Sequence, residues 1–521
     1  MTHRRSALRS ILMTSALAIA AAGLQQATPA WAGGDSEIIV AVTKLTVHLD
    51  PMGSNSNVNE RVSNNLVETL LNYDLATGEM TPGLAESWSV DETSGILSVT
   101  IRQGVKCHNG EDFNAEDVEY MFGPARYNSE DAPGYGNAVQ YLGGIREVKA
   151  TGSHTVDIIP KEPDPLIALR FASWMGQVPC ADAYKAAGSW ESWGQSVVGT
   201  GPYKLVAFKA GEHQKFERFD GYWGEKAPLK SFTLRVVPEM AARVAGLFTG
   251  EFDIITEIGP DQFDTINGND GTEIAGGPIN NIRIIPYDTR HPALKDPRVR
   301  QAMNMAIDRQ LIVDSLYGGR TVVPNGMQMK RFGNMYIGGH AGAKYDPDGA
   351  RRLLKEAGYN GEEISYRYLQ DYYTNEVSTA QVLASMWKDV GLNVKLELME
   401  NWSQIEDATA DEGRGVINWS STAVYPDPIG QVLRMFGPNG FFQRNDFWKN
   451  DKFNELGDVL MTTDHAARRD ALAQMLEIYE KDPPATYLHV LPMFYGKQSA
   501  IAWTPSGTAF MDLRAGSISI D

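Results

Sequence analysis

Cys107 and His108 are adjacent, and their side chains are common ligands of zinc and related metals. A metal site needs further histidines or cysteines at ligand spacing, and no second pair accompanies these two. Gly199, Gly201 and Pro202 could form a phosphate-binding loop, but neither a GxGxxG pattern nor a P-loop lysine follows them. We therefore expect a capping or surface role for the histidine, a tight turn at the glycines, and no metal or other cofactor.

Residues for catalysis are equally sparse. The chain has no GxSxG nucleophile elbow and no HExxH motif, and its nine histidines are scattered singly. The 65 acidic residues could include a glycosidase pair, but sequence cannot measure the separation of two carboxylates. We expect no enzymatic activity and keep a secreted hydrolase as the alternative from another functional class.

The net charge disfavours two kinds of partner, and the length predicts the domain organisation. The formal net charge is −18, whereas nucleic acids and anionic membranes attract basic surfaces, so both are disfavoured as partners. A chain of 521 residues exceeds what one hydrophobic core usually holds. We expect more than one lobe.

The first 32 residues have the pattern of an export signal. Arg4, Arg5 and Arg9 precede an apolar run at 11–24, and a small-residue cleavage site ends at Ala32. The adjacent arginines leave secretory and twin-arginine export both open. No cysteine stands at the cleavage site and no later apolar stretch reaches 18 residues, so we expect an exported protein without a lipid anchor or membrane span.

The only two cysteines of the sequence, Cys107 and Cys180, could pair in an oxidising compartment. The loop between them is long enough for a bridge to be worth about 4 kcal/mol of loop-closure entropy. Two separate buried thiols are the alternative, because pairing cannot be derived from sequence.

Hydrophobic periodicity predicts a mixed α/β protein. A helix is expected at 58–71, a second begins at Asn114 with Asp117 completing a capping box, and a third spans 239–249. From residue 281 helices alternate with short strands, which suggests a separate α/β lobe. Strands are expected at 37–42, 96–101, 155–159, 231–237, 252–255 and 392–398.

An ordered series of short motifs runs along most of the chain. The stretch 82–122 begins with Pro-x-Leu-Ala-x-Ser-Trp and continues through Arg-x-Gly-Val-Lys-x-His to Ala-x-Asp-Val. Further motifs lie at 49–51, 199–203, 220–224, 296–302, 306–309, 345–347 and 425–428. In this order they resemble family 5 of the bacterial solute-binding proteins, the dipeptide, oligopeptide and nickel class that serves ABC transporters.

The resemblance implies an α/β, two-lobed periplasmic-binding-protein fold of class II, cluster C type, with a ligand cleft between the lobes. Lobe one would combine residues 33–280 and 485–521 and carry an extra subdomain inserted at about 82–190, and residues 281–484 would form lobe two. No linker-like segment marks these boundaries, as expected of a chain that crosses between lobes twice.

The residues that hold a peptide in the family's peptide-binding members are replaced here. Those proteins carry an aspartate ahead of Tyr-Pro-Asp-Pro that binds the peptide's α-amino group, and Val424 stands at that position. The arginine that binds the peptide's carboxylate aligns with Gln370, which lacks a guanidinium. An ordinary peptide is therefore disfavoured as ligand.

The remaining candidate ligand-binding residues are aromatic or carry hydroxyl, amide or carboxylate groups. Such side chains stack on sugar rings and bond to hydroxyls, or enclose a cation against Asp371, so we expect an oligosaccharide, a polyol or a cationic small molecule. About half of the set is expected in the core instead. The set comprises Asn55 of lobe one with Gln370, Asp371, Tyr372, Tyr373, Trp402, Trp419, Ser421, Thr422 and Tyr425 of lobe two.

The resemblance thus implies a monomeric periplasmic receptor that captures one solute by lobe closure. It would deliver the solute to an inner-membrane ABC permease with its ATPase subunits. A di- or oligopeptide receptor and a nickel or metal-chelate receptor are the alternatives within the family.

Overall fold

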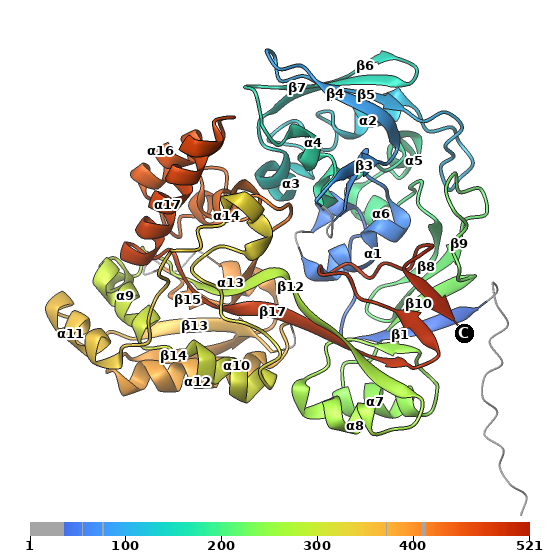
Figure 1. Cartoon of the computed structure of the whole chain (residues 1–521). Coiled ribbons are helices and arrows are strands. Elements are labelled where there is room, and N and C mark those ends of the chain that lie inside the picture. The colour runs from blue at the N-terminus through green and yellow to red at the C-terminus, as the bar shows by residue number, and fades with distance from the viewer. Residues whose placement is uncertain (1–35, 55, 75–77, 371, 408–412, 521) are drawn as a thin grey trace, which may run out of the picture.

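The structure, a computed structural model, describes residues 36–520 apart from 55, 75–77, 371 and 408–412. Its largest sheet consists of β1 (Glu37–Val42), β8 (Tyr203–Lys209), β9 (His213–Arg218), β10 (Ser231–Val236), β11 (Ile254–Ile255), β12 (Thr272–Pro286), β16 (Trp419–Thr422) and β17 (Ala485–Gln498). The strand order is β16-β12-β17-β11-β1-β10-β9-β8 (Figure 1). β1 is parallel to β10 and β11, and the other pairs are antiparallel.

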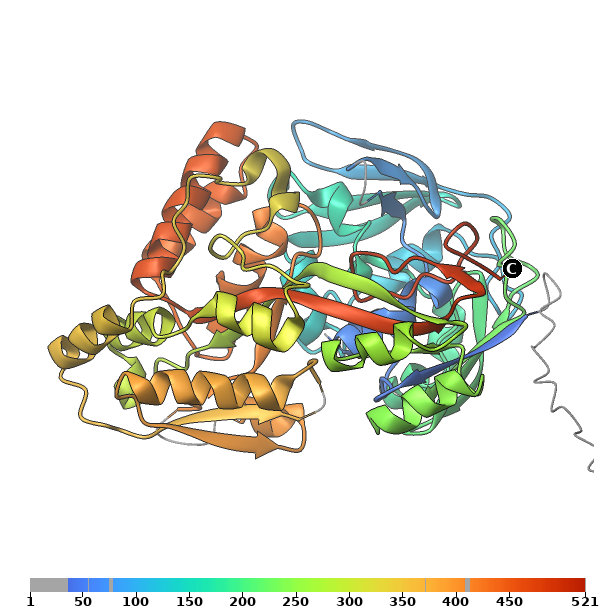
Figure 2. The same cartoon turned by 60° about the horizontal axis from the view of Figure 1, so that its bottom comes forward.

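The long strands β12 and β17 run from one half of the molecule into the other (Figures 1 and 2). They pair from Thr272 opposite Gln498 to Pro286 opposite Ala485, with a register shift after Pro278. β17 is buried along almost its whole length, as expected of a strand covered on both faces. A crossing of two neighbouring strands is suited to a hinge, because small backbone rotations there move whole lobes.

We call the part built around β1 and β8–β11 lobe one, and the part built around the second, parallel sheet lobe two. That sheet has the order β14-β13-β15, formed by β13 (Ile364–Leu369), β14 (Val394–Met399) and β15 (Val416–Ile417). The helix α12 (Glu376–Asp389) makes the crossover between β13 and β14. Its Trp387 is fully buried and donates its indole N–H to the carbonyl of Met303 at 3.0 Å.

Further helices complete both lobes. Those of lobe two include α9 (Pro297–Met305), α10 (Arg309–Tyr317), α11 (Pro347–Ala357), α16 (Asp451–Leu460) and α17 (His465–Lys481). In lobe one, α7 (Met240–Phe248) and α8 (Phe263–Asn267) lie beside β17 and β12 (Figure 1). Within the described part of the chain, no helix combines the length and apolar character that a membrane crossing needs.

A four-stranded antiparallel sheet of order β4-β5-β7-β6 forms the upper part of lobe one in Figure 1. Its strands are β4 (Ala85–Val90), β5 (Leu97–Ile101), β6 (Ile145–Gly152) and β7 (Thr155–Pro160), and α2 (Ala115–Met121) packs against it. The capping box predicted for this helix is present: Asn114 bonds to the helix backbone, and the carboxylate of Asp117 accepts the N–H of Asn114 at 2.9 Å.

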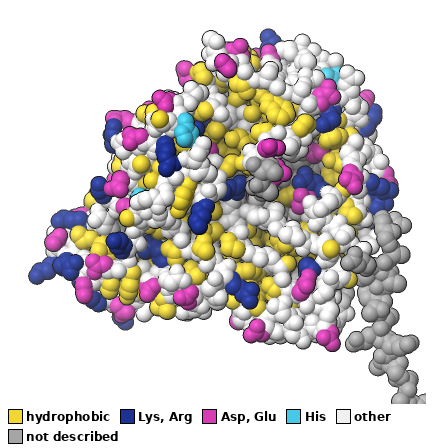
Figure 3. Space-filling model, in the orientation of Figure 1, with side chains coloured by type: hydrophobic (Ala, Val, Ile, Leu, Met, Phe, Trp, Pro, Cys, Tyr) yellow, Lys and Arg dark blue, Asp and Glu magenta, His cyan; other side chains and the backbone are white. Residues whose placement is uncertain are grey.

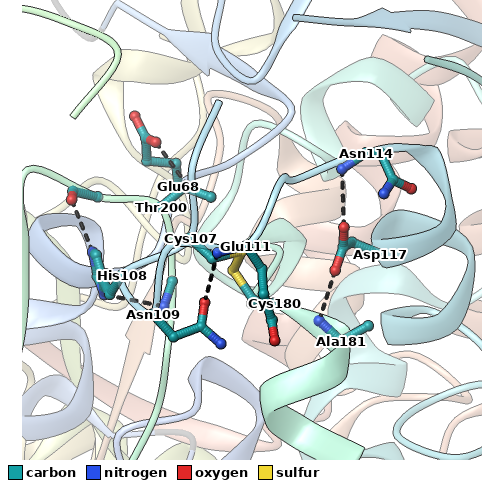
Figure 4. Close-up of a disulfide and its surroundings, with 12 residues drawn as sticks. Glu68, Cys107, His108, Asn109, Glu111, Asn114, Asp117, Cys180, Ala181 and Thr200 are labelled. Carbon is teal, nitrogen blue, oxygen red and sulfur yellow. Dashed lines mark hydrogen bonds between the residues drawn. A yellow bond between two sulfur atoms is a disulfide. The ribbon is translucent and has the colours of Figure 1, made fainter. Parts of the chain in front are cut away.

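Cys107 and Cys180 form a disulfide that ties this region to the segment beginning α5 (Ala181–Ala186) (Figure 4). Asp117 joins the same two segments, because its other carboxylate oxygen accepts the N–H of Ala181 at 2.8 Å. The neighbouring His108 bonds to the backbone of the glycine turn, where its Nε2 lies 2.9 Å from the carbonyl oxygen of Gly201.

Most of the predicted elements agree with the structure within two residues, and one helix end was wrong. The helix α1 (Asn57–Leu66) stops at Leu66, whereas apolar periodicity extended it to 71. Val67 is already extended, and Thr69 forms a β-bridge with Gln177. A local apolar pattern does not reveal this long-range pairing.

The expected crossovers near Asn281 and Pro484 fall within β12 and directly before β17. Acidic and basic side chains are interspersed over the face in Figure 3. Among the described residues on that face there is no extended basic surface of the kind that nucleic acids require.

Candidate ligand-binding site

A cavity of about 460 Å³ lies between the two lobes. Lobe one contributes the start of α1, part of α3 (Tyr135–Leu142) and Trp174. Lobe two contributes residues 372–373, β16 and the short helices α13 (Trp402–Glu406), α14 (Val432–Phe436) and α15 (Phe441–Arg444). Sites for small organic molecules usually enclose about 300–1,000 Å³, so the cavity can hold one such molecule.

The lobe-one side of the cavity is polar. Ser56 is the N-cap of α1, and its hydroxyl accepts the N–H of Asn59. This cap starts the helix at the cavity, so that Ser56, Asn57 and Glu60 of the first turn all line it. Gln140 of α3 adds an amide nearby.

The lobe-two side carries a continuous row of aromatic rings, which we call the aromatic wall. It consists of Tyr373, Tyr372, Trp402, Trp419 and Phe441, and all five line the cavity. Successive ring centroids lie 4.7, 4.8, 5.0 and 4.6 Å apart. The rings hold one another in place and present a polarisable surface that can pack against a sugar ring, an apolar chain or a cation.

The predicted site residues divide into three groups. Tyr372, Tyr373, Trp402, Trp419 and Thr422 line the cavity. Gln370, Ser421 and Tyr425 do not: the first is exposed at the end of β13, and the other two are buried beneath the cavity wall. Asn55 and Asp371 lie outside the described residues.

The two positions that the resemblance aligns with peptide-binding residues, 424 and 370, differ in their placement. Val424 lines the cavity with an aliphatic side chain, whereas Gln370 lies outside it. Two arginines of lobe two do reach the cavity, Arg434 of α14 and Arg444 of α15. The motif alignment placed the carboxylate-binding arginine near residue 370, and these two arginines lie more than 60 residues later in the chain, so the sequence did not predict them.

Hydrogen bonds join the lobes on either side of the cavity. The Tyr372 hydroxyl accepts the backbone N–H of Asn57 at 3.3 Å. Arg170 donates to the Tyr425 hydroxyl at 3.0 Å, which explains why this tyrosine is buried away from the cavity. Arg434 donates to Gln140 at 3.2 Å, and Arg444 donates to a lobe-one carbonyl at 2.9 Å. The lobes are therefore in contact, and this is a closed arrangement.

Sequence reasoning missed two carboxylic acids in the cavity lining, Glu60 of α1 and Glu406 of α13. Burial raises the pKa of each from the ordinary 4.5 to about 7, against the opposing effect of nearby arginines. The available signal for Glu406 was its spacing: it follows Trp402 by four residues, which places both on one face of a helix.

Comparisons with known proteins agree with the fold and the motifs. Residues 79–443 match the sequence profile of the bacterial extracellular solute-binding proteins, family 5, middle region. The dipeptide-binding protein of Escherichia coli K12 is 26% identical over 443 residues, covering 80% of this chain and 82% of that protein.

Solved structures share the two-lobed fold. The dipeptide-binding protein from Pseudoalteromonas sp. SM9913 in complex with Met-Leu superimposes with a TM-score of 0.84 at 20% identity, covering 93% of this chain and 100% of that one. The NikA protein of Staphylococcus aureus in complex with Ni(L-His)2 does so with a TM-score of 0.79 at 18% identity, covering 93% and 100%. With the profile match covering most of its length, the chain belongs to family 5 of the bacterial extracellular solute-binding proteins, the transport receptors of ABC importers.

Proposed function

We propose that this protein is the extracytoplasmic receptor of an ABC importer that encloses one small polar solute in the cavity between its lobes. The observation that carries the proposal is a cavity lined by both lobes and flanked by hydrogen bonds between them. The closed receptor would then present its solute to an inner-membrane permease with its ATPase subunits. The role is binding without catalysis.

Closure and solute binding are coupled in this proposal. A solute shifts the equilibrium only to the extent that it binds the closed form better than the open one. A change from 1% to 99% closed requires a differential affinity of about 5.5 kcal/mol. Contacts of the solute with both lobes at once can supply this difference in affinity, since in the open form the solute contacts only one lobe.

The lining favours a solute other than an ordinary zwitterionic peptide. Val424 offers no counter-charge for an α-amino group where peptide-binding relatives have an aspartate, and Gln370 lies outside the cavity. The aromatic wall and the polar lobe-one side suit an oligosaccharide, a polyol or a cationic small molecule.

A peptide receptor is the second candidate. It is supported by the dipeptide-binding relatives and by Arg434 and Arg444, two cationic residues of the cavity lining. A nickel-chelate receptor is a third candidate, supported by the likeness to NikA in complex with Ni(L-His)2. The described residues include no group of three or more histidines, cysteines, aspartates or glutamates suited to a metal ion, so the chelator would have to supply the metal ligands.

Small-angle scattering of the mature protein with and without solute tests the receptor function. The solute is first identified by native mass spectrometry of the protein as purified and after incubation with a bacterial metabolite extract. We expect the radius of gyration to fall on binding. An unchanged radius at saturation would contradict lobe closure, and binding of mixed di- to pentapeptides measured by calorimetry would favour the second candidate.

Export and assembly are proposals of the same kind. Residues 1–32 are proposed as a signal that directs the chain to the periplasm, where it acts as a monomer. N-terminal sequencing of the mature protein tests the signal, osmotic-shock fractionation tests the periplasmic location, and light scattering tests the monomeric state.

A further inference from the structure

Two glutamates line the same cavity from opposite lobes. Glu60 projects from the first turn of α1 in lobe one, and Glu406 stands at the end of α13 in lobe two. Among the described residues, neither carboxylate has a hydrogen-bond or ion-pair partner, although both are largely surrounded by protein. An unpaired carboxylate in such surroundings is costly when ionised, which distinguishes these two from the paired acids of the scaffold.

The charged groups around Glu60 do not neutralise it. Arg434 and Arg331 are the cations that act on it, and burial outweighs both, since its pKa is raised to about 7. The Arg434 guanidinium is committed to holding the closed lobes together. It donates to the carbonyls of Gly430 and Thr422, the amide oxygen of Gln140 and the hydroxyl of Tyr141.

The carboxylate of Glu406 is likewise not neutralised by the cation near it. The cation that acts on it is Arg414, whose Nε donates to the carboxylate of Asp288 at 3.0 Å, so this arginine already has an acid partner. Burial again raises the pKa of Glu406 to about 7. The remaining arginine of the cavity, Arg444, donates to the backbone carbonyls of Asn439 and Gly136.

The aromatic wall lies next to Glu406. Trp402 precedes it by four residues on α13, and both side chains line the cavity. Tyr372 and Trp419 flank Trp402 at 4.8 and 5.0 Å between centroids. Ring faces attract cations, more strongly where water is excluded, so the wall and the carboxylate favour the same kind of group.

We propose that the solute carries a cationic nitrogen, an ammonium or a guanidinium, which binds between Glu60 and Glu406 against the aromatic wall. This proposal rests on the receptor function proposed above and narrows its solute class. It also explains what drives closure. With the lobes apart each carboxylate faces water, whereas closure buries both in one cavity, where the loss of water makes each charge costly until a cation binds there.

The test uses methylguanidinium chloride and methylurea, which have nearly the same shape and differ in charge. Binding to the full mature protein, freed of co-purified solute by unfolding and refolding, is followed by tryptophan fluorescence at pH 8. We expect methylguanidinium to bind at least tenfold more tightly than methylurea. Glu60→Gln and Glu406→Gln should each reduce this ratio, and the double variant should bring it close to one, whereas Glu116→Gln, an exposed acid on α2, should leave it unchanged.

Equal affinity for the two probes, absence of binding by both, or a ratio unaffected by the double variant would overturn the cation site. The receptor function is tested by a separate measurement, the radius of gyration with and without solute. A neutral sugar captured from the metabolite extract, with a smaller radius of gyration, would refute the cationic solute and leave the receptor intact. A cation-selective cavity without any change in radius would support the site and refute the closing receptor.

Discussion

Replacing Glu60 with glutamine should make the protein more stable at alkaline pH. The folded state holds the pKa of this carboxyl at about 7, against an ordinary value of 4.5. Between these two values the folded state keeps a proton that the unfolded chain has released, so the stabilising effect of the bound proton is lost as the pH rises through 7. At pH 8 the folded protein therefore contains an ionised, desolvated carboxylate that has no hydrogen-bond or ion-pair partner among the described residues.

The size of the effect follows from the two pKa values. Each unit of difference corresponds to about 1.4 kcal/mol, so ionised Glu60 lowers the free energy of unfolding by about 3 kcal/mol at pH 8 and by almost nothing at pH 4. Glutamine has nearly the same shape and no charge. The expected gain of Glu60→Gln is thus about 3 kcal/mol at pH 8, and an average unfolding entropy per residue converts it to a rise of about 3 °C in melting temperature.

Differential scanning calorimetry at pH 8 and pH 4 measures the difference. Small-angle scattering of the same solute-free samples establishes that their lobes are closed, because the raised pKa belongs to the closed arrangement. Glu116→Gln is the matched control, because it removes an exposed acid of the same type from the first turn of α2, where little change is expected. A Glu60→Gln variant no more stable than the wild type at pH 8, or stabilised equally at pH 4, would show that this carboxyl is not held uncompensated in the cavity.

Three further predictions concern the contacts around the site. Tyr372→Phe removes the hydroxyl that accepts the Asn57 N–H, so the closed form should lose about 1 kcal/mol and the solute should bind about fivefold more weakly in calorimetry, while an unchanged affinity would count against this bond as a closing contact. Reducing the Cys107–Cys180 bridge, which spans 73 residues, should lower the free energy of unfolding by about 4 kcal/mol in urea titrations with and without dithiothreitol, and the double serine variant should no longer respond to the reductant. Burial lowers the pKa of His108 from 6.5 to about 4, so on acidification the unfolded chain binds a proton before the folded protein does. The free energy of unfolding should therefore fall by about 3 kcal/mol as the pH decreases from 6.5 to 4. His108→Gln should flatten this pH dependence, and an equal slope in both proteins would refute the lowered pKa.

Local sequence patterns predicted much of the scaffold of lobe one. The capping box at Asn114 and Asp117 and the strand at residues 37–42 depend on neighbours in the chain, and both are present. The end of α1 at Leu66 was not predictable, because the segment after it is held by Gln177 from a distant part of the chain. Extended pairing there overrides an apolar pattern that fits a longer helix.

For the candidate site, half of the ten residues proposed from the sequence line the cavity. Trp402 and Trp419 were proposed as ligand-binding residues and line the cavity, whereas Tyr425, from the same set, is held in the core by Arg170. A tyrosine or tryptophan packs equally well in a core or at a binding surface, so its type and spacing do not reveal its partner. Only the packing of the two lobes separates these cases.

The sequence by itself determined the family and the α/β class, because these depend on the order of residues along the chain. Tertiary structure alone decided that Cys107 bonds to Cys180 and that Glu60 and Glu406 line one cavity, where neither has a partner among the described residues. Bond formation and desolvation depend on which atoms surround a group in space, and those atoms come from distant parts of the chain. The charge that we propose for the solute can therefore be inferred only from the folded arrangement of the two lobes.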